Sequence, residues 1–98
     1  MKKYDVLIVG LGPTGGTLAN LLALHGFSIL IVEKEKSFYP LPRAVHFDDE
    51  IMRVFQTIGI TKKFLKHTII NKGTKFVNSK NKVVLDGPRP RSITKNGW

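Results

Sequence analysis

A chain of 98 residues has room for one small domain with a single hydrophobic core. Hydrophobic residues make up 42% of it and charged residues 23%, which is ordinary globular usage and argues against wholesale disorder. The absence of cysteine excludes disulfides, thiolate nucleophiles and cysteine-ligated metal sites. No apolar run reaches the roughly 18 residues of a membrane span, and the apolar run near the N-terminus lacks a signal-peptide cleavage site. We therefore expect a soluble, cytoplasmic protein with no membrane partner.

The net charge of +9 is unevenly distributed. Residues 1–50 carry five basic and six acidic residues, a net charge of −1, whereas residues 51–98 carry eleven basic residues against one acidic residue, a net charge of +10. Such asymmetry can indicate nucleic-acid binding. The basic residues are nevertheless spread thinly and form no known nucleic-acid module. We favour solvated lysines and no nucleic-acid partner, and keep a small basic nucleic-acid-binding or interaction protein as an alternative.

The first third of the chain predicts a strand, a helix and a second strand. Tyr4–Val9 is an apolar run typical of a parallel strand buried on both faces. Thr14–His25 reads as a helix, with Pro13 suited to its first turn and Gly26 at the position of a left-handed C-cap. This helix has little polar surface, so we expect it to be packed on a sheet and largely covered. Ser28–Val32 is the second apolar strand, which completes a βαβ unit.

A loop rich in proline follows, and then two helices. Asp48 starts the first helix and Gly59 ends it, with acidic residues in the first turn where they complement the helix dipole. Its expected buried face consists of Ile51, Val54, Phe55 and Ile58. Thr61–His67 predicts one more short helix.

The last third predicts a β-hairpin. Thr74–Asn78 and Lys82–Asp86 are its expected strands, joined by a turn at Ser79-Lys80-Asn81. Gly87–Arg91, with the sequence GPRPR, is expected to be an extended loop, because proline cannot donate to a ladder.

The glycines between the first strand and the helix form a G-x-G-x-x-G motif. Gly10 permits a tight turn, Gly12 lets the backbone approach a pyrophosphate, and Gly15 lets the helix pack closely on the strand. The helix that begins at Pro13 and Thr14 would point its free N–H groups and its positive dipole end at the phosphates. The motif predicts a site for a dinucleotide that contains ADP.

Glu33 supports this interpretation because it stands at the end of the second strand, 23 residues after Gly10. A carboxylate at this position can accept both hydroxyls of an adenosine ribose, and it disfavours an adenosine 2′-phosphate because like charges would meet. The alternative is a purely structural tight turn and a surface acid. The motif itself does not choose between FAD and NAD.

Two segments carry a resemblance to a known family. VLIVGLGPTGGTLANLLALHGFSILIVEKE resembles the N-terminus of the group A flavoprotein aromatic hydroxylases, which are FAD-dependent monooxygenases. PLPRAVHFDDEIMRVFQTIGI, Pro40 to Ile60, resembles a more specific segment of the 3-(3-hydroxyphenyl)propionate hydroxylase branch, and the closing Asn96-Gly97-Trp98 is similar to an element of the same branch. The resemblance is clear over residues 4–60 and weaker over 61–98.

The resemblance implies FAD as the cofactor. The glycines would hold its pyrophosphate and Glu33 its adenosine ribose, while Arg43 matches a family arginine near the phosphates and would be a bidentate partner for oxyanions. The alternative for Arg43 is a loop arginine in solvent. The predicted FAD-binding residues are Gly10, Gly12, Pro13, Thr14, Gly15, Glu33, Lys34 and Arg43.

The family reaction is hydroxylation of a phenolic or other aromatic acid with NAD(P)H and O₂. Because the cofactor carries that chemistry, we expect no catalytic residue in this segment. We also expect no metal site: the three histidines share no ligand spacing, and Asp48, Asp49 and Glu50 suit capping of a helix better than metal binding or acid catalysis.

The predicted fold class is α/β, a Rossmann-like FAD-binding βαβ unit with an added helix and β-hairpin, forming an incomplete domain. Residues 1–98 would be the N-terminal part of an FAD/NAD(P)-binding domain, with the βαβ unit at 4–33, a loop and helices at 34–67, and a hairpin and extended tail at 74–98. We expect a piece of a larger hydroxylase that is inactive alone and meets its small aromatic substrate only in a full-length form. An NAD-binding module of a dehydrogenase stays open as an alternative.

Overall fold

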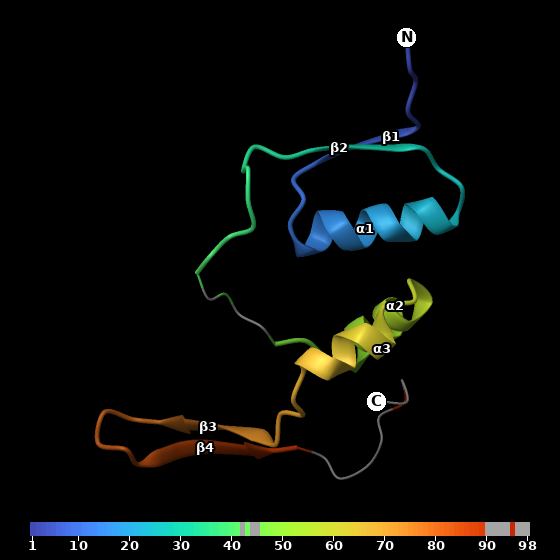
Figure 1. Cartoon of the computed structure of the whole chain (residues 1–98). Coiled ribbons are helices and arrows are strands. Elements are labelled where there is room, and N and C mark those ends of the chain that lie inside the picture. Colours follow the sequence, from blue (N-terminus) through green and yellow to red (C-terminus); the bar gives the residue numbers. More distant parts are fainter. Residues whose placement is uncertain (42, 44–45, 90–94, 96–98) are drawn as a thin grey trace. The chain divides into compact units, whose positions relative to one another are not determined.

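The computed structural model describes residues 1–41, 43, 46–89 and 95, and it has mixed α/β content (Figure 1). The chain divides into two compact units, Met1–Phe47 and Asp48–Trp98. Across the described ranges, every helix is too short or too polar to cross a membrane. The closing Asn96-Gly97-Trp98 and part of the expected tail lie outside the described residues.

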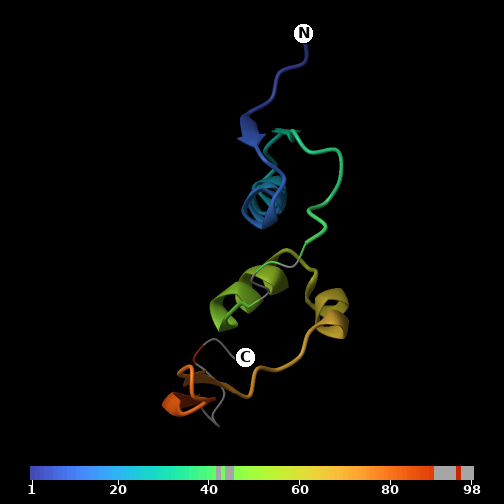
Figure 2. The same ribbon diagram turned by 90° about the vertical axis from the view of Figure 1, so that its left-hand side faces the viewer.

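The first unit is a parallel βαβ arrangement. Strand β1 (Val6–Val9) is followed by helix α1 (Pro13–Leu24) and strand β2 (Ile29–Val32), and the two strands pair in parallel from Val6 with Ile29 to Val9 with Val32. Figures 1 and 2 show α1 running along one face of this strand pair. All three elements match the predicted ones to within two residues at each end. As expected, Gly26 follows the helix with a left-handed φ of +82°.

Both strands begin later than predicted, directly after Asp5 and Ser28, whose side chains take part in hydrogen bonds between these two residues. The Ser28 hydroxyl and N–H both donate to Asp5 Oδ2, at 2.6 and 2.8 Å, and the Asp5 N–H donates to Ser28 Oγ at 3.1 Å. The Ser28 hydroxyl, followed by the Ser28 N–H, holds the pKa of Asp5 below its usual value. This pairing fixes the start of the sheet at the edge opposite the glycine motif.

The predicted burial of the first unit is wrong in extent. Ile8 and Ala19 are buried where α1 meets the sheet, but Leu7 and Val9 on the other face of β1 are 60% and 80% exposed. Along α1, Leu24 is exposed as well. The physical reason is that one helix covers only one face of a two-stranded sheet, so the alternate strand residues point away from it.

The second unit begins with helices α2 (Asp49–Thr57) and α3 (Thr61–Phe64), followed by a 3₁₀ turn, η1 (Leu65–His67). Asp48 caps α2, since its Oδ1 accepts a hydrogen bond from the Ile51 N–H at 3.0 Å. The predicted start is therefore confirmed, and Gly59 follows the helix with φ +81°.

The predicted buried face of α2 is only partly correct. Met52 is the buried residue of the helix, whereas Ile51 is exposed. Phe55 lies on the half-buried face and packs edge-on against the Phe64 ring of α3, with ring centroids 4.5 Å apart. Phe55 therefore meets α3 from the predicted face, and the apolar spacing alone placed the most buried position slightly wrongly.

The predicted hairpin is present as antiparallel strands β3 (Gly73–Val77) and β4 (Val83–Pro88) (Figure 1). The expectation that the chain leaves the ladder at Gly87 is wrong, because Gly87 and Pro88 pair with Thr74 and Gly73. Pro88 fits because the next bond of the ladder comes from the Arg89 N–H, which donates to the Lys72 carbonyl at 3.3 Å. The missing N–H of Pro88 therefore points away from the partner strand.

Candidate functional site

The parallel strands bring the glycine motif and Glu33 to one edge of the sheet. Val9 and Val32 are the last paired residues, and the Gly10 N–H extends the ladder by donating to the Val32 carbonyl at 2.7 Å. Gly10 and Glu33 therefore leave the sheet side by side. In open α/β sheets, ligands bind at this carboxyl edge of the strands.

The glycine turn, residues Gly10–Gly15, comprises the link after β1 and the first residues of α1. It needs glycine at two positions for different reasons. Gly10 has φ +100°, a left-handed backbone conformation that other residues rarely adopt. A Cβ on Gly15 would collide with the Gly10 carbonyl oxygen and would lie 3.3 Å from Ile8 Cγ2. The predicted roles of Gly10 as the tight turn and Gly15 as the close contact between helix and strand agree with this geometry.

Gly12 differs from both, because a Cβ built on it meets no atom within 4 Å. Its backbone, with φ −76° and ψ −175°, is an ordinary extended conformation. Nothing within the described fold therefore requires glycine here. The space beside its Cα is free for a group from outside, which agrees with the predicted approach of a pyrophosphate.

The start of α1 offers free hydrogen-bond donors beside that space. Gly12 is the N-cap and has no side chain to accept a bond, Pro13 is the first helical residue, and the Gly16 N–H bonds to the Gly12 carbonyl at 2.9 Å. The N–H groups of Thr14 and Gly15, in the first turn, have no intrahelical acceptor. Together with the positive end of the helix dipole, these two donors suit an anionic oxygen.

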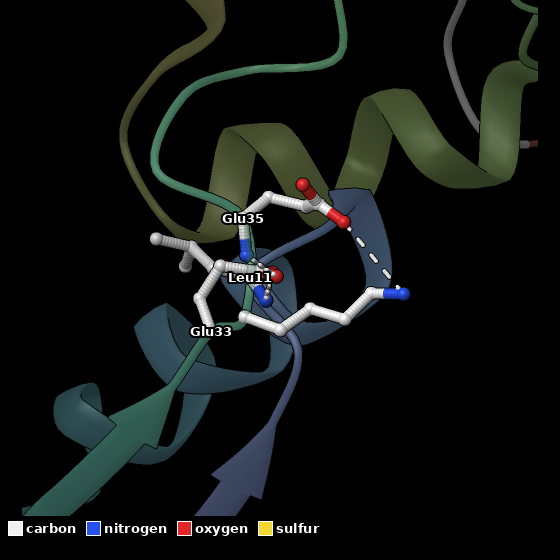
Figure 3. A network of polar contacts seen from close by, with 4 residues as sticks. Leu11, Glu33 and Glu35 are labelled. Carbon is white, nitrogen blue, oxygen red and sulfur yellow. Dashed lines mark hydrogen bonds and ion pairs between the residues drawn. The ribbon is translucent and has the colours of Figure 1, made fainter.

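The Glu33 carboxylate accepts hydrogen bonds from two backbone segments, one that follows β1 and one that follows β2 (Figure 3). Its Oε2 accepts a hydrogen bond from the Leu11 N–H at 2.7 Å, and its Oε1 accepts one from the Glu35 N–H at 2.9 Å. These N–H groups, Glu35 first and Leu11 second, hold the pKa of Glu33 below its usual value. The carboxylate is therefore ionised at neutral pH and fixed beside the glycine turn.

Lys34 and Arg43 are less closely tied to the turn. Lys34 Nζ lies 3.6 Å from Glu35 Oε1 in an exposed ion pair, which contributes little to stability. Arg43 places its guanidinium over the Tyr39 ring, 4.3 Å from the ring centroid. Neither of these two interactions involves the glycine turn. The predicted contacts of Lys34 and Arg43 with FAD therefore stay predictions.

Two residues that contact predicted site residues were not predicted: Leu11, which bonds to Glu33, and Tyr39, whose ring lies against Arg43. Leu11 contributes through its backbone N–H, which no sequence letter marks, although its place between two motif glycines could have drawn attention to it. Tyr39 could have been found as an aromatic residue four positions before the predicted phosphate-binding Arg43. Among the described residues, no group of three His, Asp or Glu side chains could hold a metal ion.

A parallel βαβ unit with this turn and this carboxylate is typical of dinucleotide-binding α/β proteins. The class becomes a particular family through sequence comparison. The chain belongs to the FAD binding domain family, whose model matches residues 3–95. This match confirms FAD as the expected cofactor and disfavours the alternative of an NAD-binding dehydrogenase module.

Curated relatives are aromatic hydroxylases. A protein of Rhodococcus jostii (strain RHA1), named a probable NADH-specific resorcinol 4-hydroxylase, is 47% identical over 85 residues, which are 87% of this chain and 16% of the relative. The 3-(3-hydroxy-phenyl)propionate/3-hydroxycinnamic acid hydroxylases of Mycobacterium avium (strain 104) and Mycolicibacterium gilvum (strain PYR-GCK) are 40% and 39% identical over 94 residues, which are 96% of this chain and 16% of each relative. No solved structure matches. The predicted resemblance to this hydroxylase branch is confirmed, and the chain spans about a sixth of the length of these relatives.

Proposed function

We propose that this chain forms the ADP-binding part of a Rossmann-like FAD site in an aromatic hydroxylase. One observation carries the proposal: in a member of the FAD binding domain family, the Glu33 carboxylate is fixed beside a glycine turn with free space at Gly12. The turn suits the pyrophosphate, and the carboxylate suits the hydroxyls of the adenosine ribose.

Each predicted residue has a defined role in this proposal. The N–H groups of Thr14 and Gly15 bind pyrophosphate oxygens, and the bare Cα of Gly12 lets these oxygens come close. Pro13 fixes the first turn of the helix that carries these donors. Arg43, by resemblance, and Lys34 add positive charge, and the Tyr39 ring holds the Arg43 guanidinium in place before FAD binds.

The proposed reaction of the larger enzyme is hydroxylation of a phenolic or related aromatic ring with NAD(P)H and O₂. Bound FAD supplies the redox chemistry, and the residues of this chain bind and orient its ADP half. The names of the relatives support both the aromatic substrate and the nicotinamide reductant. Because the chain matches only 16% of their length, we expect the 98-residue chain to bind FAD weakly and to have no hydroxylase activity.

A pair of glycine substitutions tests the proposed role of the turn. Gly12→Ala fits the described fold, because its Cβ meets nothing within 4 Å, but this Cβ would occupy the space proposed for the pyrophosphate. Gly16→Ala is the matched control, because its Cβ meets only Leu11 Cδ1 at an ordinary 3.8 Å. FAD binding is followed by quenching of flavin fluorescence.

We expect Gly12→Ala to weaken FAD binding by about tenfold, or about 1.4 kcal/mol, whereas Gly16→Ala binds as the parent chain does. Equal affinity of the two variants would contradict a pyrophosphate at Gly12. A second titration compares AMP with 2′,5′-ADP, which differs from AMP only by its 2′-phosphate. The Glu33 carboxylate should make the 2′-phosphate compound the weaker ligand, and equal binding of both would contradict its proposed contact with the ribose.

A further inference from the structure

Glu33 links two segments of backbone that neither strand nor helix holds. The Leu11 N–H lies between the end of β1 and the start of α1, and the Glu35 N–H lies in the loop after β2. Each donates to a different oxygen of the Glu33 carboxylate, at 2.7 and 2.9 Å. We call these two hydrogen bonds the Glu33 bridge.

The bridge joins residues 22 positions apart in sequence and therefore restrains the glycine turn against the second strand. Apart from the bridge, the hydrogen bond from the Gly10 N–H to the Val32 carbonyl connects the turn to β2. Glycine-rich backbone loses much conformational entropy when it becomes ordered, so an additional restraint has a large share in fixing its conformation. Hydrogen bonds to an ionised acceptor are also stronger than neutral ones.

The bridge does not use up the carboxylate. An ionised carboxylate has about four acceptor positions, and the bridge occupies one on each oxygen. The Lys34 N–H, which also lowers the pKa of Glu33, acts on the carboxylate as well. At least one acceptor position therefore remains, and a ribose hydroxyl is a matching donor.

We propose that Glu33 is a positioning residue that fixes the glycine turn before FAD binds, in addition to its proposed contact with the ribose. The inference rests on the proposed function, because it assigns the fixed turn to the binding of the FAD pyrophosphate. The proposal also assigns a different acceptor to each donor of the turn. The Leu11 N–H donates to Glu33, and the N–H groups of Thr14 and Gly15 donate to the phosphates.

The test measures amide exchange with water by NMR in the 98-residue chain without FAD. Glu33→Gln keeps the length of the side chain but has only one oxygen acceptor, and Glu33→Asp is one methylene shorter. We expect faster exchange at Leu11, Glu35 or both in each variant. Unchanged exchange at both amides in the folded variants would overturn the bridge.

Glu35→Gln is the matched control, because it removes a neighbouring carboxylate and its ion pair with Lys34 but keeps the Glu35 N–H. It should leave exchange at Leu11 unchanged. If it accelerated Leu11 exchange as much as Glu33→Gln does, a general effect of local charge would replace the bridge. Exchange in β1, at Val6–Val9, reports whether each variant remains folded.

A measurement on the unsubstituted chain keeps the test valid if the variants fail to fold. The Leu11 amide resonance should shift with the same midpoint as the Glu33 carboxyl carbon when the pH is lowered. The charged neighbours on the Glu33 segment are Lys34 and Glu35, and residues 10–24, which form the turn and α1, carry no charged side chain. A Leu11 amide that does not respond, or that follows the Glu35 carboxyl carbon, would overturn the inference.

These measurements are separate from the proposed function, because no ligand is present in them. A normal bridge together with no FAD binding would contradict the proposed function. FAD binding with Leu11 exchange unaffected by both Glu33 substitutions would contradict the bridge alone.

Discussion

Hydrogen bonds between side chains and backbone reach farther along the sequence in the first unit than in the second. In the first unit, side chains bond to backbone 22 or 23 positions away, as Asp5 does with Ser28 and Glu33 with Leu11. In the second unit, the side-chain bonds of Asp48 and Asn78 join residues two to four positions apart. Long-range bonds fix the geometry of a site, whereas local bonds fix the ends of individual elements.

The net charge also differs between the two halves of the chain, and the larger net charge lies in the second half. Residues 51–98 carry a net charge of +10, and the described hairpin strands are exposed along their whole length. The first half is nearly neutral, and it contains the turn and the carboxylate that define the site. The groups proposed to bind FAD therefore lie in the half of the chain with the smaller net charge.

The largest expected effect comes from Gly15→Ala. Its Cβ would collide with the Gly10 carbonyl, so α1 must move away from β1, and overpacking of this kind costs about 1–3 kcal/mol. Unfolding in urea, followed by amide signals of Val6–Val9, should show this loss, and FAD binding should be lost with it. Signals of β3 and β4 should not change. An undisturbed β1 in this variant would contradict the close contact at Gly15.

Arg43→Gln tests whether the binding role extends into the loop after β2. Loss of a charged hydrogen bond to phosphate should weaken FAD binding by about 1.5 kcal/mol, which is roughly tenfold. Arg53→Gln is the matched control in the second unit, where the Arg53 side chain bonds to Gln56 Oε1 at 2.7 Å. If both variants bind FAD equally well, Arg43 is a loop arginine without a cofactor role.

Asp48→Ala should affect the second unit alone. It removes the bond to the Ile51 N–H, and loss of an N-cap costs about 1 kcal/mol. Helix α2 should therefore fray, as measured by amide exchange at Ile51, while FAD binding stays at the level of the parent chain. A parallel loss of FAD binding would show that the two units are coupled.

Acid should produce the smallest effect, because both carboxylates concerned are exposed. The pKa values of Asp5 and Glu33 are lowered in the folded chain, so their stabilisation is present above their ordinary values of 3.8 and 4.5. It is lost as the pH falls through the lower folded values. The urea concentration at the midpoint of unfolding of the first unit should therefore decrease when the pH is lowered below 4.5. A midpoint that is constant down to pH 2 would contradict these hydrogen bonds.

The order of the elements, and the position of the glycine motif and Glu33 at one edge of the sheet, could be predicted from local signals. Glycine spacing, Pro13 and the apolar runs specify the βαβ unit, and Asp48 and Gly59 mark the ends of α2. These signals depend on the chemistry of single residues and their immediate neighbours. For that reason most element ends were predicted to within one or two positions.

Burial and backbone contacts could not be predicted in the same way. The exposure of Leu7 and Val9 depends on what covers the second face of the sheet, which periodicity does not encode. Gly87 and Pro88 pair because the register of the hairpin turns the proline nitrogen outward. The Leu11 contact with Glu33 uses a backbone N–H that every residue except proline has.

The proposed function requires the ADP half of FAD to bind at the glycine turn of the first unit. The most direct test is an NMR titration of the isotope-labelled chain with ADP, which maps the amides that respond. We predict shifts at Leu11, Thr14, Gly15 and the residues next to Glu33, and none in β3 or β4. Shifts confined to the basic residues beyond Asp48, with an unresponsive turn, would contradict the claim.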